Sequence, residues 1–242
     1  IKYKINVDTK RTLKNAVMRA SKGEKVRTRT IEAVKNLTLD VPHGSVLGIV
    51  GANGAGKSTL LNVLAGSIAP DTGSVRIGDT VRIGYFKQEV PHLPPTQTVI
   101  GAVRAIAEYI DGGVGREKYI SARELLERFR FPSHRHGSRV ETLSGGERRR
   151  LELCRVLMAN PNVLMLDEPT NDLDISTIQA LEEFLDGFPG CVIFASHDRF
   201  FIDRVAQQVL AFDGTGTIKW IHGAYESYQE WLQLKSDALP RT

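Results

Sequence analysis

The sequence of 242 residues has only two cysteines, no long apolar run and no cysteine spacing typical of a metal site. No uninterrupted apolar stretch approaches the roughly 18 residues that a transmembrane helix needs, so we expect no membrane span. The start, IKYKINVDTKRTLKN, is basic and has no apolar segment typical of a secretory signal. Cys154 and Cys191 lie in apolar surroundings, which indicates inert core thiols in a reducing compartment. These absences predict a cytoplasmic protein.

Charge is unevenly distributed along a chain of ordinary composition. Hydrophobic residues make up 41% and charged residues 25%, as in globular proteins with a sizeable core. The net charge is +4, but residues 1–30 hold ten Lys or Arg against Asp8 and Glu24, a net charge of +8. Such a segment can dock on phosphate backbones or on anionic lipid, or it can be a solvated arm. We predict a basic lead over 1–30, with a first strand and an insertion, ahead of a main domain over 31–242.

A strand, a glycine-rich loop and a helix follow one another from residue 46. Residues 46–50 (VLGIV) suit a buried parallel strand, residues 51–58 read GANGAGKS, and the leucines that follow have helical spacing. This is the context of a Walker A loop, in which backbone N–H groups point at the β-phosphate and the helix start adds positive potential. Lys57 can reach the β- and γ-phosphates, and the Ser58 hydroxyl can bind Mg²⁺. The residues predicted to hold the nucleotide are Gly51, Asn53, Gly54, Ala55, Gly56, Lys57, Ser58 and Thr59.

Two further strand patterns end in residues suited to hydrolysis. Residues 163–166 (VLML) lead into Asp167, a carboxylate placed to hold Mg²⁺ through water. The adjacent Glu168 can polarise an attacking water as general base. Residues 191–195 (CVIFA) lead to His197, where a contact to the γ-phosphate is geometrically reasonable.

A second glycine-rich stretch, LSGGE at 143–147, opens another helix. Ser144 and Glu147 form a capping box there, and the helix N-terminus with its two glycines is a second anion site. One monomer cannot wrap both loops around one phosphate if they lie apart on its surface, whereas two copies facing head to tail can. Each copy would then lend Ser144, Gly145 and Gly146 to the nucleotide of the other. We interpret the arginines at 148–150 as a charged helix face rather than a nucleic-acid contact.

With these motifs the sequence resembles the ABC ATPases over nearly its whole length, and LSGGE resembles their signature motif. No NKxD motif of guanine-specific relatives occurs. The resemblance implies an α/β fold of the P-loop NTPase type: a mostly parallel core sheet flanked by helices, with an antiparallel β part and a helical subdomain. We place that subdomain at about 91–142, where PHLPPT reads as a linker and residues 98–110 and 119–129 as helices.

The same resemblance implies ATP and Mg²⁺ as cofactors, and ATP hydrolysis in a sandwich of two ATPase domains. Gln88 in GYFKQ matches the Q-loop, NDLD with Asp174 matches the D-loop, and His197 matches the switch histidine. Its implied metal residues are Ser58, Gln88 and Asp167. Its implied catalytic residues are Glu168, His197 and Gln88. Asp174 and Tyr3, the latter as the adenine-stacking aromatic, complete the expected nucleotide contacts.

The partner depends on the class of ABC protein. LDEPTNDLDI, SHDRFFIDRVA and VLAFDGTGTIKWIHGAYESY resemble the ABC-F family of ribosome-associated ATPases over residues 46–232. That resemblance implies the ribosome or its rRNA as a partner, and a second ABC domain, because ABC-F proteins usually carry two. Residues 3–23 (YKINVDTKRTLKNAVMRASKG) and 30–51 (TIEAVKNLTLDVPHGSVLGIVG) instead resemble ATPase subunits of polysaccharide exporters. That resemblance implies a transmembrane permease as partner.

Several identities of the chain are therefore possible. The chain can be half of an ABC-F protein, a one-domain relative that pairs as a homodimer, a composite, or a transporter ATPase. A clamp that binds ATP without hydrolysing it is a third function, against which Glu168 and His197 argue. We rank ABC-F first because its resemblance covers more residues and more specific motifs.

Overall fold

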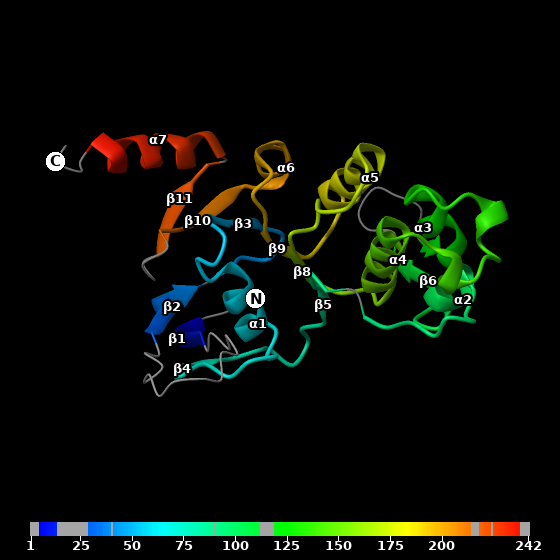
Figure 1. Cartoon of the computed structure of the whole chain (residues 1–242), viewed down its shortest axis with the longest axis horizontal. Coiled ribbons are helices and arrows are strands. Elements are labelled where there is room, and N and C mark those ends of the chain that lie inside the picture. Colours follow the sequence, from blue (N-terminus) through cyan, green and yellow to red (C-terminus); the bar gives the residue numbers. More distant parts are fainter. Residues whose placement is uncertain are drawn as a thin grey trace, which may run out of the picture.

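A mostly parallel sheet forms the centre of the protein (Figure 1). The structure is a computed structural model, and it describes residues 5–13, 29–39, 41–89, 91–111, 119–213, 218–223 and 225–237. Its strands are β3 (Val46–Gly51), β5 (Ile83–Phe86), β8 (Val163–Asp167), β9 (Cys191–Ala195), β10 (Gln208–Phe212) and β11 (Ile218–His222). The order across the sheet is β11-β10-β3-β9-β8-β5. All neighbours pair in parallel except β10 and β11, which are antiparallel. The predicted α/β class is confirmed.

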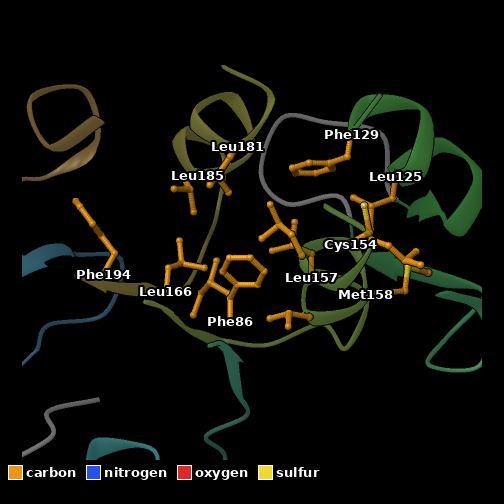
Figure 2. Close-up of a cluster of buried hydrophobic side chains, with 14 of the residues drawn as sticks. Phe86, Leu125, Phe129, Cys154, Leu157, Met158, Leu166, Leu181, Leu185 and Phe194 are labelled. Carbon is orange, nitrogen blue, oxygen red and sulfur yellow. The ribbon is translucent and has the colours of Figure 1, made fainter. Parts of the chain in front are cut away.

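Both faces of this sheet are buried, which is why its central strands are continuous apolar runs. Every residue of β8 and β9 is buried, and alternate residues of each strand belong to two different hydrophobic clusters. Leu166 points toward Leu185 of α5 (Ile175–Asp186), and Leu157 of α4 (Gly145–Met158) lies nearby (Figure 2). The ring of Phe194 instead meets that of Phe201 on α6 (Arg199–Val205), with ring centroids 5.2 Å apart. The opposite face packs on α1 (Lys57–Leu64). Helix α7 (Tyr225–Asp237) follows β11.

A three-stranded antiparallel sheet accompanies the core. It contains β1 (Ile5–Leu13), β2 (Arg29–Leu39) and β4 (Thr72–Val75), in the order β2-β1-β4. β1 pairs with β2 from Ile5 opposite Leu39 to Leu13 opposite Arg29. The basic lead thus contributes a strand to this sheet, and the boundary that we predicted at residue 31 falls inside β2.

The segment predicted as a helical subdomain contains a short hairpin as well as helices. It comprises α2 (Val99–Arg104), β6 (Tyr109–Asp111), β7 (Tyr119–Ser121), α3 (Ala122–Arg128) and two 3₁₀ turns at Ser133–Arg135 and Val140–Thr142. The helices predicted over 98–110 and 119–129 were therefore too long. Tyrosine and isoleucine favour strands, and Ile110 and Ile120 are buried while their neighbouring tyrosines are exposed.

Side-chain caps set the observed helix starts in this segment. Thr98 Oγ1 accepts a hydrogen bond from the N–H of Gly101 at 3.1 Å, so α2 begins after it. Ser121 Oγ accepts from the N–H of Glu124 at 3.1 Å, which starts α3 at residue 122 rather than at 119. Within the described ranges, no helix is both long and apolar enough to cross a membrane.

Core packing leads to a first prediction. Ile202 of α6 is fully buried, whereas Ile175 at the start of α5 is 77% exposed. We expect Ile202→Ala to lower the free energy of unfolding by about 2–5 kcal/mol, because the deletion removes apolar burial and leaves a cavity. Ile175→Ala, the same change at an exposed helical position, should alter it by less than about 0.5 kcal/mol. Denaturant unfolding of both variants measures the difference, and equal effects would contradict this account of the core.

Candidate active site

The phosphate loop connects the end of β3 to the start of α1. Gly56 is the N-cap of α1 and has φ +111°, a backbone conformation that residues with a side chain rarely adopt. Lys57, the first residue of the helix, is buried and folds back across the loop, where its Nζ donates to the carbonyl oxygen of Gly51 at 2.8 Å. The loop therefore holds an ammonium group beside the N-terminus of a helix, which suits a polyphosphate.

A carboxylate and a hydroxyl meet where β8 ends. Ser58 Oγ donates to Asp167 Oδ1 at 3.1 Å. Burial raises the pKa of Asp167, an effect that this hydrogen bond and the charges of Lys57 and Arg149 oppose. Hard oxygen donors such as these are the ligands that Mg²⁺ takes in phosphate sites, so the pair fits the implied metal. Bound Mg²⁺ would favour the ionised form of Asp167.

Glu168 connects three segments of the site. Its Oε1 lies 3.6 Å from Lys57 Nζ, and its Oε2 lies 2.8 Å from His197 Nδ1, so an N–H at Nδ1 donates to the carboxylate. Glu168 is 7% exposed, whereas the side chain of His197 is 60% exposed. A buried carboxylate with one cation and one imidazole beside it is suited to accept a proton from water.

These groups surround one cavity of about 360 Å³. Its lining residues are Asn53, Gly54, Gly56, Lys57, Ser58, Thr59, Gln88, Glu168, Asn171 and His197. Asn171 was not among the predicted site residues, although it begins the NDLD motif. Gly51 and Ala55 contribute to the loop but do not line the cavity, and Tyr3 lies outside the described residues. The structure thus gathers loop, Q-loop, carboxylate and histidine, which the sequence had presented as separate patterns.

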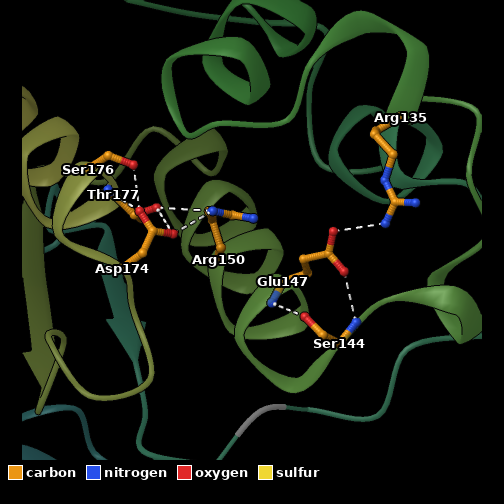
Figure 3. Close-up of polar contacts among 7 residues, drawn as sticks. All are labelled: Arg135, Ser144, Glu147, Arg150, Asp174, Ser176 and Thr177. Atoms are coloured by element: carbon orange, nitrogen blue, oxygen red, sulfur yellow. Dashed lines mark hydrogen bonds and ion pairs between the residues drawn. The ribbon is translucent and has the colours of Figure 1, made fainter.

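The signature residues lie apart from this cavity. Ser144 Oγ accepts from the N–H of Glu147 at 3.2 Å, and the N–H of Ser144 donates to Glu147 Oε2 at 2.9 Å, which confirms the predicted capping box (Figure 3). Arg135 also donates to Glu147, at 2.8 Å. The backbone hydrogen bond from Ser144 lowers the pKa of Glu147. Ser144 and Gly145 are exposed, so the start of α4 faces outward rather than into the nucleotide cavity of its own chain.

Asp174 also lies outside the cavity. It is the N-cap of α5, accepting from the N–H of Thr177 at 2.9 Å, and it receives Arg150 Nη1 at 2.8 Å (Figure 3). The hydrogen bond from Ser176 is the largest of the contacts that lower the pKa of Asp174 to about 2. The structure therefore shows a helix cap and an ion pair at this residue, which link the D-loop to α4.

The charged helix face that we predicted for residues 148–150 is found only at Arg148, which is exposed, because the other two arginines turn inward. Arg149 is only 3% exposed. Arg150 is half-buried beneath the D-loop, and its guanidinium group contacts the ring of Phe131. For Arg149 and Arg150 the prediction was wrong, because the helix packs against the core on the side that carries them. Their spacing alone could not show this, since charged residues are rarely buried.

A parallel sheet with a phosphate loop after β3 and an acidic pair after β8 defines a P-loop nucleoside triphosphatase. The family model for ABC transporters matches residues 34–171. The uncharacterized ABC transporter ATP-binding protein YfmR of Bacillus subtilis is 47% identical over 195 residues, covering 81% of this chain and 31% of that protein. The energy-dependent translational throttle protein EttA of Escherichia coli K12 is 39% identical over 212 residues, covering 85% and 37%.

Solved structures agree on the fold. The dimeric ATP-binding cassette MJ0796, in a post-hydrolysis state bound to ADP and Pi, superposes with a TM-score of 0.65 at 23% identity, covering 92% of this chain and all of that one. The chain belongs to the ABC transporter family and has the fold of an ABC cassette, as the sequence predicted. It spans about a third of the length of the two curated relatives.

The position of Lys57 leads to a second prediction. We expect Lys57→Ala to weaken ATP binding at least tenfold, because a charge-assisted contact is worth about 1.5–3 kcal/mol. Isothermal titration with ATP measures the change. Lys219→Ala, at an exposed position of β11, is the matched control and should leave the affinity unchanged. Equal affinities of all three proteins would remove Lys57 from the site.

Proposed function

We propose that the chain binds ATP and hydrolyses it as one half of a nucleotide sandwich with a second ABC ATPase domain. The observation that carries this proposal is that Lys57, Glu168 and His197 line one cavity. The Glu168 carboxylate lies 3.6 Å from Lys57 Nζ and 2.8 Å from His197 Nδ1. The signature residues at the start of α4 stay exposed outside it. One chain thus offers a reaction centre and, elsewhere on its surface, a second phosphate-binding element.

The chemistry follows from the residues that line the cavity. Lys57 and the loop N–H groups bind the phosphates of ATP. Glu168 accepts a proton from water as the water oxygen bonds to the γ-phosphorus and the bond to the β–γ bridging oxygen breaks, giving ADP and phosphate. His197 orients the carboxylate and contacts the γ-phosphate. Mg²⁺, held by Ser58, Asp167 and Gln88, would neutralise phosphate charge.

Exposed apolar side chains support a partner domain at the same edge. Ile175 is 77% exposed and Phe200 71%, and they lie at the starts of α5 and α6. These helices follow β8 and β9, which are parallel neighbours, so both helix starts lie at the edge of the sheet that carries the cavity. The related cassette MJ0796 is itself dimeric. The partner is either a second copy or another ABC domain of a longer protein.

For the cellular role we propose an ABC-F type ATPase that acts on the ribosome. The support is the identity of 39% over 212 residues to a translational throttle protein, together with the basic lead of net charge +8 over residues 1–30. The 47% identity to YfmR, named an ABC transporter ATP-binding protein, favours the alternative of a membrane permease as partner. The two roles differ in what the ATP-bound form associates with.

Glu168→Gln tests the reaction. The amide keeps the shape of the carboxylate but cannot accept a proton, so we expect kcat to fall about 10²–10⁴-fold while ATP affinity is retained. The stalled protein should accumulate as an ATP-dependent dimer in size-exclusion chromatography. Glu230→Gln, at an exposed position of α7, is the matched control and should behave as the parent chain. Normal hydrolysis by Glu168→Gln would refute the general-base role.

The same comparison tests the clamp hypothesis. If the unmodified chain releases no phosphate from ATP at any protein concentration, yet still dimerises with ATP, the non-hydrolysing clamp is the better description. If phosphate release rises more steeply than protein concentration, two domains cooperate in the reaction.

Cosedimentation with ribosomes tests the partner. We expect the Glu168→Gln form with ATP to cosediment, with affinity that falls as salt rises. Replacing four basic residues of the lead with Gln should reduce the slope of log affinity against log salt by about 0.7 to 0.9 for each lost phosphate contact. The residues to replace are Lys22, Lys25, Arg27 and Arg29.

The matched control replaces four exposed basic residues elsewhere, which should leave the slope unchanged. These residues are Arg76, Arg123, Arg130 and Lys219. A dimerising protein that does not cosediment at low salt, and whose ATPase activity responds to membranes containing a permease, would favour the transporter role instead.

A further inference from the structure

Arg149 of α4 is buried on the side of the helix that meets the Q-loop and the acidic pair. Its Nη1 donates to the carbonyl oxygens of Lys87 at 2.8 Å and Gln88 at 2.6 Å. Its Nη2 donates to the carbonyl oxygens of Asp167 at 3.3 Å and Glu168 at 3.1 Å. One side chain therefore holds the backbone of both segments that bring catalytic groups to the cavity, the Q-loop after β5 and the acidic pair after β8.

The backbone that Arg149 holds at Glu168 has an uncommon conformation. Glu168 has φ +49°, in the left-handed region that residues other than glycine seldom adopt, and surrounding contacts must stabilise it. Its N–H donates to the carbonyl oxygen of Ala195 on β9 at 2.9 Å, and its own carbonyl accepts from Arg149. The peptide groups on both sides of its Cα are thereby fixed, which sets the direction of the carboxylate toward Lys57 and His197.

The guanidinium group suits this position for a geometric reason. Its planar fork presents separate N–H groups to two pairs of acceptors, which an ammonium group on a flexible stem cannot reproduce. Its face lies 4.4 Å from the centroid of the Phe86 ring, the residue that ends β5. All four hydrogen bonds go to backbone carbonyls, so Arg149 acts on main-chain position rather than on the charge of a catalytic side chain.

We propose that Arg149 is a positioning residue for hydrolysis, which fixes Gln88 and Glu168 and ties both to the helix that presents the signature residues. The inference rests on the proposed function, because only in a sandwich does the start of α4 contact the nucleotide of the partner domain. Arg149 would then transmit the engagement of that nucleotide to Glu168. It contacts neither Lys57 nor the phosphate loop, so it acts on turnover rather than on ATP binding.

The test compares two substitutions in the full chain. Arg149→Met removes all four hydrogen bonds, and we expect kcat to fall about 10²-fold, the scale of a displacement near 1 Å at a reacting group. The Kd for ATP should change by less than about threefold, because the loop contacts persist. Arg149→Lys keeps the charge without the fork and should recover part of the lost kcat, to about tenfold below the parent.

Hydrogen exchange provides a readout that requires no turnover. The amide of Glu168 donates to Ala195, and the amide of Asn171 donates to the carbonyl of Glu168 at 3.3 Å. We expect exchange in the segment 168–171 to be at least about tenfold faster in Arg149→Met, because this segment loses its anchor on α4.

Arg155→Met is the matched control on the same helix. Arg155 Nε donates to the carbonyl of Ala102 at 3.2 Å, and its Nη1 pairs with Glu152 at 2.6 Å, contacts that lie away from the cavity. Its loss should leave kcat and exchange in 168–171 within about twofold of the parent. Equal losses of kcat and of ATP affinity in Arg149→Met and Arg155→Met would show a purely structural role and overturn the proposal.

Unchanged kcat and unchanged exchange in Arg149→Met would also overturn it. Glu168→Gln separates this result from failure of the proposed function. If Glu168→Gln hydrolyses ATP at the parent rate, the general-base role fails, while the exchange comparison still decides whether Arg149 positions the segment. If Glu168→Gln is inactive and Arg149→Met is normal in both readouts, only the positioning role fails.

Discussion

The parallel pairing of β3, β9 and β8 is the constraint on which the rest of the structure depends. Parallel strands end at the same edge of a sheet, so the phosphate loop after β3, the histidine after β9 and the acidic pair after β8 meet there. Asp167 of β8 pairs with Ala195 of β9, and Ala195 in turn pairs with Ile49 near the end of β3. Residues more than a hundred positions apart therefore share a cavity without any long loop having to position them.

Buried charge at that edge is the second theme, since it would destabilise the fold if left unpaired. Lys57 and Glu168 offset one another, and Ser58 donates to Asp167. The Nη1 and Nη2 groups of Arg149 donate to backbone carbonyl oxygens instead, whereas its buried Nε has no partner among the described residues. Each of these buried side chains has a partner at close range. Because these groups are shielded from water, each of the interactions between them is stronger than it would be at the surface.

The helix α4 faces two ways. Ser144 and Gly145 at its start are exposed and held by a capping box, and in the proposed sandwich they would contact a phosphate of the partner domain. One turn later, Arg149 and Arg150 reach inward to the Q-loop, the acidic pair and the D-loop. Fourteen residues of helix thus connect a surface element to three segments of the active site. A rigid element with contacts at both ends is the physical basis for coupling between two sites.

The sequence by itself determined the strand–loop–helix of the phosphate site, the strands that end in Asp167 and His197, and the capping box of Ser144. Each is a local pattern whose chemistry depends on neighbours in the chain. Only the tertiary structure decided that residues 109–111 and 119–121 pair as a hairpin, that Arg150 pairs with Asp174, and that Arg149 is buried under the Q-loop. These outcomes depend on which distant surfaces meet. Helix periodicity cannot show whether a charged side faces water or a cluster of backbone carbonyls, because both satisfy the charge.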